Sequence, residues 1–333
     1  MLDASGQLVT DFTGIVNPTV KDSKVTVTCL KNSNKDDSPA FTFTDYPNTI
    51  FIGNDSVRNG KFSFTFTVPK DISYSNLQGK MNLYAVDTES GNEAQGNFDN
   101  FIVGGTSDTA ETDTIGPEIR ALYLNDTTFV DGGQVNTTPY FVAELWDKSG
   151  VNITGSSVGH DMMLVIDEST VLSYNLNSYY ELLPGEDGTG IVKFPIPALE
   201  PGKHTAEFWV WDILNNSTVR TFTFEVVEGL KPFLFDVIAT PGIAREQVTF
   251  HLMHNRPESR MRVGIMVYDL AGRQLWKHEE SGTSGLFENY TVSWDLTSGG
   301  ARMRPGVYIY RAAISTDNSK DATKARKFII LGE

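Results

Sequence analysis

The chain of 333 residues carries 27 Lys and Arg against 42 Asp and Glu, a formal net charge of −15, with 40% hydrophobic and 21% charged residues. This composition is typical of a globular protein, and its acidic excess argues against the concentrated basic surface of a nucleic-acid-binding protein. No apolar run approaches the ~20 residues of a membrane helix, so we expect no transmembrane segment. The single cysteine, Cys29, cannot form an intramolecular disulfide, which argues against a disulfide-stabilised scaffold.

The first part of the chain predicts a β-sandwich over residues 1–104. It opens with MLDASGQLV, which has neither the basic region nor the apolar core of a signal peptide. A turn and a strand follow at once, as expected of a fragment that starts inside a hairpin. Apolar and polar residues alternate over 24–30, 62–68 and 81–86, the period of a sheet with one buried face. We expect an additional strand of this sandwich to come from upstream of Met1.

A polar stretch punctuated by Gly and Pro, residues 105–117, is typical of a linker. Behind it, residues 118–230 predict an immunoglobulin-like sandwich from five strands at turn-punctuated spacing. The predicted strands cover residues 139–147, 160–167, 190–197, 203–212 and 220–227. No cysteine pair joins the two sheets of this domain, so packing alone must hold them together.

The last domain, residues 231–333, repeats the pattern of short strands but differs in charge. It carries 14 Lys and Arg against 11 Asp and Glu, whereas residues 1–230 carry 13 against 31. We therefore expect the last domain to have a different partner from the acidic remainder. Within it, VYDLAGRQLW at residues 267–276 predicts a hairpin that turns at Ala271 and Gly272.

No catalytic pair emerges from the residues that usually carry one. Cys29 lies on the apolar face of an alternating stretch, which predicts a small buried side chain rather than a nucleophile. The nearest plausible base, His160, lies across the linker. His251 and His254 are three residues apart in a predicted strand, so they project to opposite faces and form no zinc clamp. We expect no cofactor.

Two loops and three tryptophans remain as candidate binding residues. Asp147 and Asp212, each at the end of a predicted strand, could supply oxygen ligands to Ca²⁺, but such residues more often form Asx turns; both interpretations stay open. Trp146, Trp209 and Trp211 could stack on a sugar. Because Trp209 and Trp211 share one strand face, we interpret them as core residues. The residues alone indicate binding, spacing or anchoring modules.

The last domain resembles the C-terminal sorting domain of the type IX secretion system of Bacteroidetes. That family carries a hairpin with an Asp-x-x-Gly-Arg turn, a Trp-Asp segment with a following Gly, a Gly-x-Tyr strand and a basic, then apolar last strand. The matching residues are Tyr268, Asp269, Gly272, Arg273, Trp294, Asp295, Gly299, Gly306, Tyr308 and Lys327. The entry to the domain, often Asn-Pro in the family, is here Thr240-Pro241. The resemblance implies docking on the outer-membrane shuttle barrel of that system.

The upstream sequence resembles the region that follows the peptidase domain in the sortase of the same system, a member of the gingipain-like cysteine peptidase family. The stretches that carry this resemblance are residues 51–72, 122–167 and 203–218. It implies a parent enzyme, located at the cell surface, that removes sorting domains from cargo and transfers the cargo to lipopolysaccharide. The catalytic His and Cys of that family would lie upstream of Met1, since neither Cys29 nor His160 matches them.

We therefore predict an all-β chain of three tandem β-sandwiches, the middle one immunoglobulin-like and the last a type IX sorting domain. Its predicted role is non-catalytic: it braces the upstream peptidase domain and docks the protein on the shuttle barrel. The expected docking surface is aromatic and basic. It consists of Tyr268, Arg273, Trp276, Trp294, Arg302, Arg304, Tyr308 and Tyr310. The alternatives are a surface adhesin or glycan-binding module with the same sorting domain, and a hydrolase with an unrecognised site.

Overall fold

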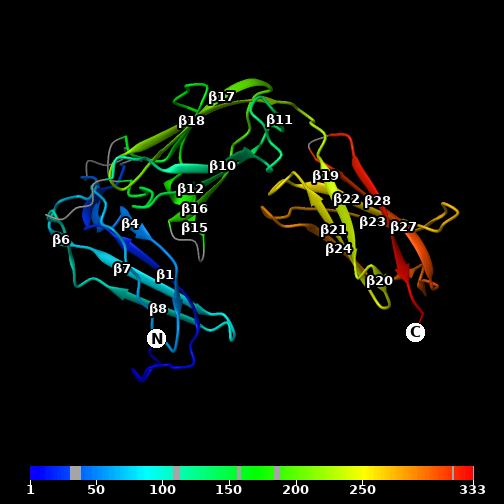
Figure 1. The fold of residues 1–333 in the computed structure, drawn as a ribbon, viewed down its shortest axis with the longest axis horizontal. Helices are drawn as coiled ribbons and strands as arrows, with labels where there is room; N and C mark the ends of the chain where they lie inside the picture. The colour runs from blue at the N-terminus through cyan, green and yellow to red at the C-terminus, as the bar shows by residue number, and fades with distance from the viewer. Residues whose placement is uncertain (31–38, 108–112, 156–158, 184–187, 317–318, 333) are drawn as a thin grey trace. The chain divides into compact units, whose positions relative to one another are not determined.

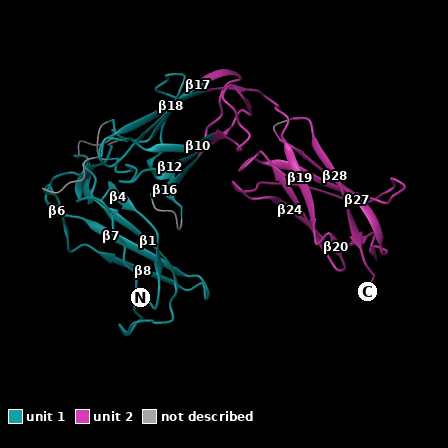
Figure 2. Cartoon of the chain, in the orientation of Figure 1, with its two compact units in different colours: residues 1–122, 143–193, 205–222 teal, residues 123–142, 194–204, 223–333 magenta. Residues whose placement is uncertain are grey.

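The computed structural model describes residues 1–30, 39–107, 113–155, 159–183, 188–316 and 319–332. These residues form β-strands joined by turns, with one short 3-10 helix at Asn177–Tyr179 (Figure 1). The all-β prediction is confirmed. Part of the predicted linker, residues 108–112, lies outside the described residues. The chain forms two compact units, unit 1 with residues 1–122, 143–193 and 205–222, and unit 2 with the remainder (Figure 2). The predicted domain boundaries stay a prediction.

The first sheet of unit 1 is built around β1, which lies between β4 and β7. Its strands are β1 (Gly14–Lys21), β4 (Thr49–Ile52), β5 (Asp55–Val57), β7 (Lys80–Asp87) and β8 (Glu93–Phe98), in the order β4-β1-β7-β8 with β5 on the other half of β1. Alternation decides which side chains enter the core: Val16 and Val20 are fully buried, whereas Asn17 between them is exposed. Two small pairs accompany this sheet. They are β2 (Val25–Thr28) with β3 (Thr42–Asp45), and β6 (Leu77–Gln78) with β9 (Ile102–Val103).

The strand predicted over residues 62–68 is not formed as a sheet strand, because these residues have no ladder partner among the described residues. Their alternation still has a structural use. Phe64 and Phe66 stack on Phe51, with ring centroids 5.8 and 4.9 Å apart. The segment is therefore held by its aromatic side chains rather than by backbone hydrogen bonds.

Residues 118–226 form two further sheets, as expected for a sandwich. One has the order β10 (Glu118–Leu124), β12 (Tyr140–Trp146), β16 (Thr189–Pro195), β15 (Tyr180–Leu182). The other has the order β11 (Gln134–Val135), β18 (Ser217–Val226), β17 (Gly202–Trp211), β13 (Met163–Ile166), β14 (Ser173–Asn175). The buried side chains of β17 are Ala206, Phe208 and Val210. From Ala206 to Val210, the even-numbered residues of β17 therefore face the core, and the odd-numbered residues face away from it.

Unit 2 contains a three-stranded and a five-stranded sheet packed over one core. The first has the order β19 (Leu234–Thr240), β21 (Val248–His254), β24 (Tyr290–Trp294). The second has the order β20 (Ile243–Ala244), β28 (Ala322–Ile330), β27 (Gly306–Ser315), β22 (Met261–Tyr268), β23 (Gln274–Gly282), and β25 (Thr297–Ser298) pairs β26 (Ala301–Arg302) in a small hairpin. Phe250, Tyr310 and Phe328 meet at the centre of the core, with ring centroids 4.9 to 6.0 Å apart.

Among the described residues, no helix has both the length and the apolar character needed to cross a membrane.

Candidate functional site

The predicted hairpin forms between β22 and β23, and its turn is organised by one carboxylate. Asp269 Oδ1 accepts hydrogen bonds from the backbone amides of Ala271 and Arg273, at 3.1 and 2.8 Å. Its Oδ2 lies 3.2 Å from Nε of Arg273, whose side chain is 78% exposed. These bonds, that of the Arg273 amide first, lower the pKa of Asp269. Gly272 has a φ of 83°, a conformation that favours glycine. The turn residues of the motif thus build the turn.

The second motif segment also makes a turn. Trp294 is buried, and its indole Nε1 donates to the carbonyl of Thr297 at 2.8 Å. Asp295 Oδ1 accepts bonds from the amide and the hydroxyl of Thr297, at 3.0 and 2.7 Å, and Gly299 has a φ of 59°. Carboxylate and indole together hold the chain as it leaves β24. We therefore assign a structural role to Trp294, Asp295 and Gly299.

The third motif segment contributes a buried residue on β27, and the last basic segment contributes an exposed residue on β28. Gly306 begins β27, and Tyr308 is buried with its hydroxyl donating to the carbonyl of Arg304 at 2.7 Å. Lys327 lies opposite Ile309 in the pairing of β27 with β28 and is exposed. Among the motif side chains, those of Arg273, Asp295 and Lys327 are exposed and that of Tyr268 is partly exposed, so a partner could reach them.

The aromatic docking surface expected from the sequence is wrong in its main members. Trp294, Tyr308 and Tyr310 are 4%, 7% and 2% exposed, and Trp276 is half-buried because it stacks on Trp294 at 4.5 Å. Aromatic residues on both sheets alternate into the core of unit 2, so their abundance reflects packing. Arg273, Arg302 and Arg304 are exposed as expected.

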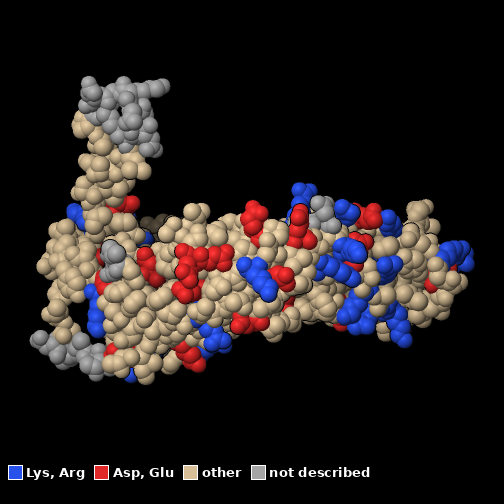
Figure 3. Space-filling model, turned by 90° about the horizontal axis from the view of Figure 1, so that it is seen from above, with Lys and Arg blue, Asp and Glu red and all other residues tan. Residues whose placement is uncertain are grey.

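A different surface of unit 2 gathers basic and apolar side chains: the side of the five-stranded sheet that points away from the core, called here the outer face. Strand register brings its residues together. They are Ile243, Arg262, Met266, Tyr268, Lys277, Val307, Ile309, Arg311, Lys327 and Ile329. The acidic residue on the same face, Glu279, is paired with Lys277 at 2.8 Å. Lys and Arg also stand out over this part of the chain in Figure 3 (blue, right half).

A buried polar network joins three segments of unit 1. The carboxylate of Asp71, 8% exposed, lies 2.7 Å from Nδ1 of His160. It also accepts bonds from the side-chain amides of Asn152 and Asn215, both at 3.0 Å. The His160 ring packs on Trp211, with centroids 4.4 Å apart. The two oxygens of a carboxylate offer about four acceptor positions, so Asp71 can bind all three partners at once and connect the segments that carry them.

Three carboxylates of unit 1 lie together and are the described residues that could hold a metal ion. Oxygens of Asp113, Asp147 and Asp212 are within 4.8 Å of one another. Asp147 and Asp212 also cap their own loops, accepting bonds from the amides of Gly150 and Asn216, at 2.8 and 2.7 Å. Burial, with a smaller contribution from the two neighbouring carboxylates, raises the pKa of Asp147 to about 6. The Asx-turn interpretation is thus correct for both loops. The tertiary fold brings the two loops close to Asp113 and so creates the cluster.

The structure corrects two expectations about single residues. Cys29 is exposed rather than buried, because it directly follows β2, which belongs to the separate β2–β3 pair and not to the main sheet. Trp209 and Trp211 are half-buried on the side of β17 opposite the core. Trp146 is covered by the guanidinium of Arg120, 5.1 Å from its ring, and Trp211 by His160. Trp146 and Trp211 therefore form no open platform for a sugar.

A Ser–His pair in unit 2 was not expected from the sequence. Nε2 of His254 lies 2.8 Å from the hydroxyl of Ser284. However, Nδ1 of His254 accepts the amide hydrogen of Arg256 at 3.1 Å, so the neutral ring carries its proton on Nε2 and donates to Ser284. Burial, and then the nearby Arg256, lower the pKa of His254 to about 4. The pair therefore has the wrong tautomer and too little basicity for a nucleophile and its base. His251 and His254 lie on β21 and face opposite sides of it, as predicted.

Fold and sites together define an all-β protein built from packed sandwiches, in which the residues of the motif support turns and core. No family model and no curated protein matches the sequence. Among solved structures, the chain is similar to dimeric latent PorU from Porphyromonas gingivalis, with 37% sequence identity over 100% of this chain and 31% of that chain, and a TM-score of 0.40. The chain thus resembles PorU along its whole length and spans about a third of it.

Two further solved structures match the chain at lower identity. One is the Ig1-2 module of the Drosophila receptor protein tyrosine phosphatase DLAR, with 9% identity, coverage of 65% of this chain and 98% of that chain, and a TM-score of 0.25. The other is the Bacteroides ovatus protein SGBP-B in complex with a mixed-linkage heptasaccharide, with 10% identity, coverage of 97% and 61%, and a TM-score of 0.28. At such low identity, neither likeness assigns a ligand to this chain.

Proposed function

We propose that this chain is the non-catalytic C-terminal part of a PorU-like cell-surface sortase. In this proposal, the upstream sandwiches brace a peptidase domain that lies before Met1. The parent enzyme cleaves sorting domains from secreted cargo and transfers the cargo to surface lipopolysaccharide. The observation that carries the proposal is the 37% identity to PorU over the whole chain. The structure of the candidate sites is in agreement, because the Ser–His pair in unit 2 lacks the tautomer that catalysis needs.

The same proposal assigns residues 231–333 as a type IX sorting domain that docks on the outer-membrane shuttle barrel. The outer face of the five-stranded sheet is the surface best suited to this contact. It combines exposed aliphatic side chains, such as Ile243 and Ile309 at 56% and 38% exposed, with the exposed cations Arg311 and Lys327. Apolar contact area stabilises a complex, while charges of one sign select an acidic partner and accelerate the encounter.

The test is a charge reversal on the outer face. The double variant Arg311→Glu/Lys327→Glu should bind the purified shuttle barrel at least about tenfold more weakly at physiological salt, measured by biolayer interferometry with the barrel in detergent. Lys231→Glu, a charge reversal that precedes β19 and lies outside both sheets, is the matched control and should bind like the unaltered chain. Equal binding by the double variant would remove the outer face from the proposal.

The alternative function, a surface adhesin or glycan-binding module, needs an exposed aromatic platform in the middle domain. Trp146 and Trp211 are covered by Arg120 and His160, so these two tryptophans do not provide one. Any glycan recognition by this chain has to come from another surface.

A further inference from the structure

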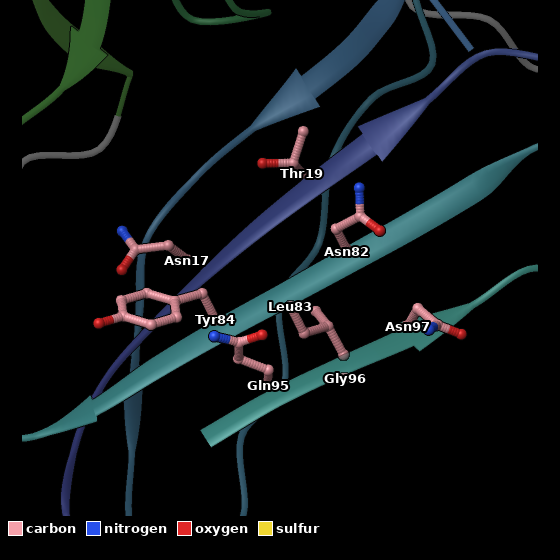
Figure 4. A pocket seen from close by; sticks show the side chains of 8 residues that line it. All are labelled: Asn17, Thr19, Asn82, Leu83, Tyr84, Gln95, Gly96 and Asn97. Atoms are coloured by element: carbon pink, nitrogen blue, oxygen red, sulfur yellow. The ribbon is translucent and has the colours of Figure 1, made fainter. Parts of the chain in front are cut away.

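The outward side of the first sheet carries a shallow groove lined by neutral polar side chains. The groove has a volume of about 380 Å³ and lies over β1, β7 and β8 (Figure 4). Its lining residues are Asn17, Thr19, Asn82, Leu83, Tyr84, Gln95, Gly96 and Asn97. The volume falls within the range of small-molecule and cofactor sites, roughly 300–1,000 Å³.

Strand register arranges these side chains in two neighbouring rows. Tyr84 pairs with both Asn17 and Gln95 across the three strands. One row further along, Asn82 pairs with both Thr19 and Asn97. Residues two apart on a strand share a face, so both rows project to the same side of the sheet. Figure 4 shows Asn17, Tyr84 and Gln95 side by side at one end of the groove.

The polar groups of these two rows are available to a ligand. The side chains of Asn17, Thr19, Asn82, Gln95 and Asn97 form no hydrogen bond with another described residue. Amide side chains each offer two donors and an acceptor, and a hydroxyl offers both functions. Tyr84 is 37% exposed, and its hydroxyl is engaged by Glu93 in the hydrogen bond that chiefly raises the pKa of Tyr84. The hydroxyl of Tyr84 is thus occupied by Glu93, whereas the aromatic ring of Tyr84 remains accessible to a ligand.

Charge decides which class of ligand fits. The nearest cations along the rows are directed elsewhere: Lys21 donates to the hydroxyl of Thr49 at 2.6 Å, and Lys80 lies over the ring of Tyr46. The charged group beside the groove is the carboxylate of Glu93. A phosphate or an acidic sugar would find no counter-charge and would be repelled by Glu93.

We propose that this groove binds a neutral oligosaccharide. Vicinal hydroxyls of a hexose match the paired donors and acceptors of Asn and Gln side chains, and the apolar face of a sugar ring packs on an exposed aromatic ring such as Tyr84. The groove is formed by residues of the first sheet of unit 1, none of which belongs to the outer face of unit 2. Its ligand binding is therefore independent of the proposed docking.

Affinity electrophoresis of the whole chain in native gels containing soluble dextran, mannan or mixed-linkage β-glucan tests the proposal. At least one of these neutral polymers should retard the chain, and polygalacturonate, an acidic polymer, should not. Asn82→Ala and Gln95→Ala should each weaken the retardation at least about tenfold. Asn100→Ala, an exposed amide outside the groove, should leave it unchanged.

Two substitutions of Tyr84 separate its ring from its hydroxyl. Tyr84→Phe should retain most of the binding, because the hydroxyl is committed to Glu93, whereas Tyr84→Ala should abolish it. Unchanged melting temperatures of all variants show that folding is intact. Absence of retardation by all three neutral polymers, or retardation that survives both Asn82→Ala and Gln95→Ala, overturns the proposal.

Discussion

Asp269 and Gly272 show, at the scale of single residues, how a motif can specify a shape. The carboxylate of Asp269 holds the amides of Ala271 and Arg273, and the backbone of Gly272 has a positive φ. Both effects are local and are encoded within five residues. Asp and Gly at this spacing therefore serve the geometry of the hairpin, and the exposed side chain of Arg273 is left as the group that a partner can reach.

Gly272→Val should destabilise unit 2 through the backbone alone. A Cβ at this position meets no atom within 4 Å, so the cost, about 1–2 kcal/mol, comes from placing a β-branched residue at positive φ. Chemical denaturation of the whole chain measures it. Gly272→Asn is the matched control and should cost less than about 1 kcal/mol, because Asn tolerates this conformation. Equal loss in the two variants would point to a side-chain clash instead.

At the scale of elements, a stack of two tryptophans links the two sheets of unit 2. Trp276 on β23 and Trp294 on β24 lie 4.5 Å apart with their rings 20° from parallel. Trp294 also contacts Phe328 on β28, with ring centroids 6.3 Å apart. The aromatic residues of the motif thus join strands that are distant in the sequence, which explains their role without any partner.

Trp294→Ala should lower the free energy of unfolding by about 3–5 kcal/mol, the usual cost of removing a buried large aromatic side chain. Trp276→Ala should cost clearly less, since this side chain is only partly buried at the edge of the core. Urea denaturation followed by circular dichroism measures both losses. If Trp294→Ala had little effect on the free energy of unfolding but weakened binding to a partner, Trp294 would act in recognition and not in the core.

At the scale of the whole molecule, each unit contains a titratable group with a strongly shifted pKa, and the two pKa values are shifted in opposite directions. Asp147 in unit 1 has its pKa raised from 3.8 to about 6, chiefly by burial. His254 in unit 2 has its pKa lowered from 6.5 to about 4, again chiefly by burial. Both groups are therefore neutral in the folded protein near pH 5. Linkage then requires them to act in opposite directions as the pH moves away from this value.

For Asp147, the folded state binds the proton more tightly than the unfolded state, so its contribution to stability is complete below pH 3.8 and is lost as the pH rises through about 6. Asp147→Asn keeps an acceptor but cannot ionise. Its stability relative to the unaltered chain should rise between pH 4 and pH 7, by on the order of 2 kcal/mol. Urea denaturation at a series of pH values measures this difference, and a flat profile would contradict the assigned pKa.

For His254, the unfolded state binds the proton more tightly, so the unaltered chain loses stability as the pH falls from 6.5 to about 4. His254→Gln removes this titration. Its stability relative to the unaltered chain should rise as the pH falls over the same range, again by on the order of 2 kcal/mol. Hydrogen exchange of peptides from β21 localises the effect to unit 2. A profile with the same slope as that of Asp147→Asn would show that the two groups do not respond separately.

The sequence by itself determined the all-β class, most of the strands and the hairpin turn at Ala271 and Gly272, because alternation and turn chemistry act over a few neighbouring residues. For Asp147 and Asp212 it left Ca²⁺ binding and Asx turns open, and the structure shows the Asx turns. It did not determine the inward side of a strand such as β17, whose residues Phe208, Trp209, Val210 and Trp211 are apolar on both faces.

The tertiary structure decided what depends on packing across the chain. It buried Phe208 and left Trp209 half-exposed, turned Trp294 and Tyr308 into the core, and placed Cys29 at the surface. It also brought Asp113, Asp147 and Asp212 together and aligned Asn17, Tyr84 and Gln95 in one row. The physical reason is that burial and proximity are set by which sheet covers a strand and by strand register, and both are long-range properties that no local pattern contains.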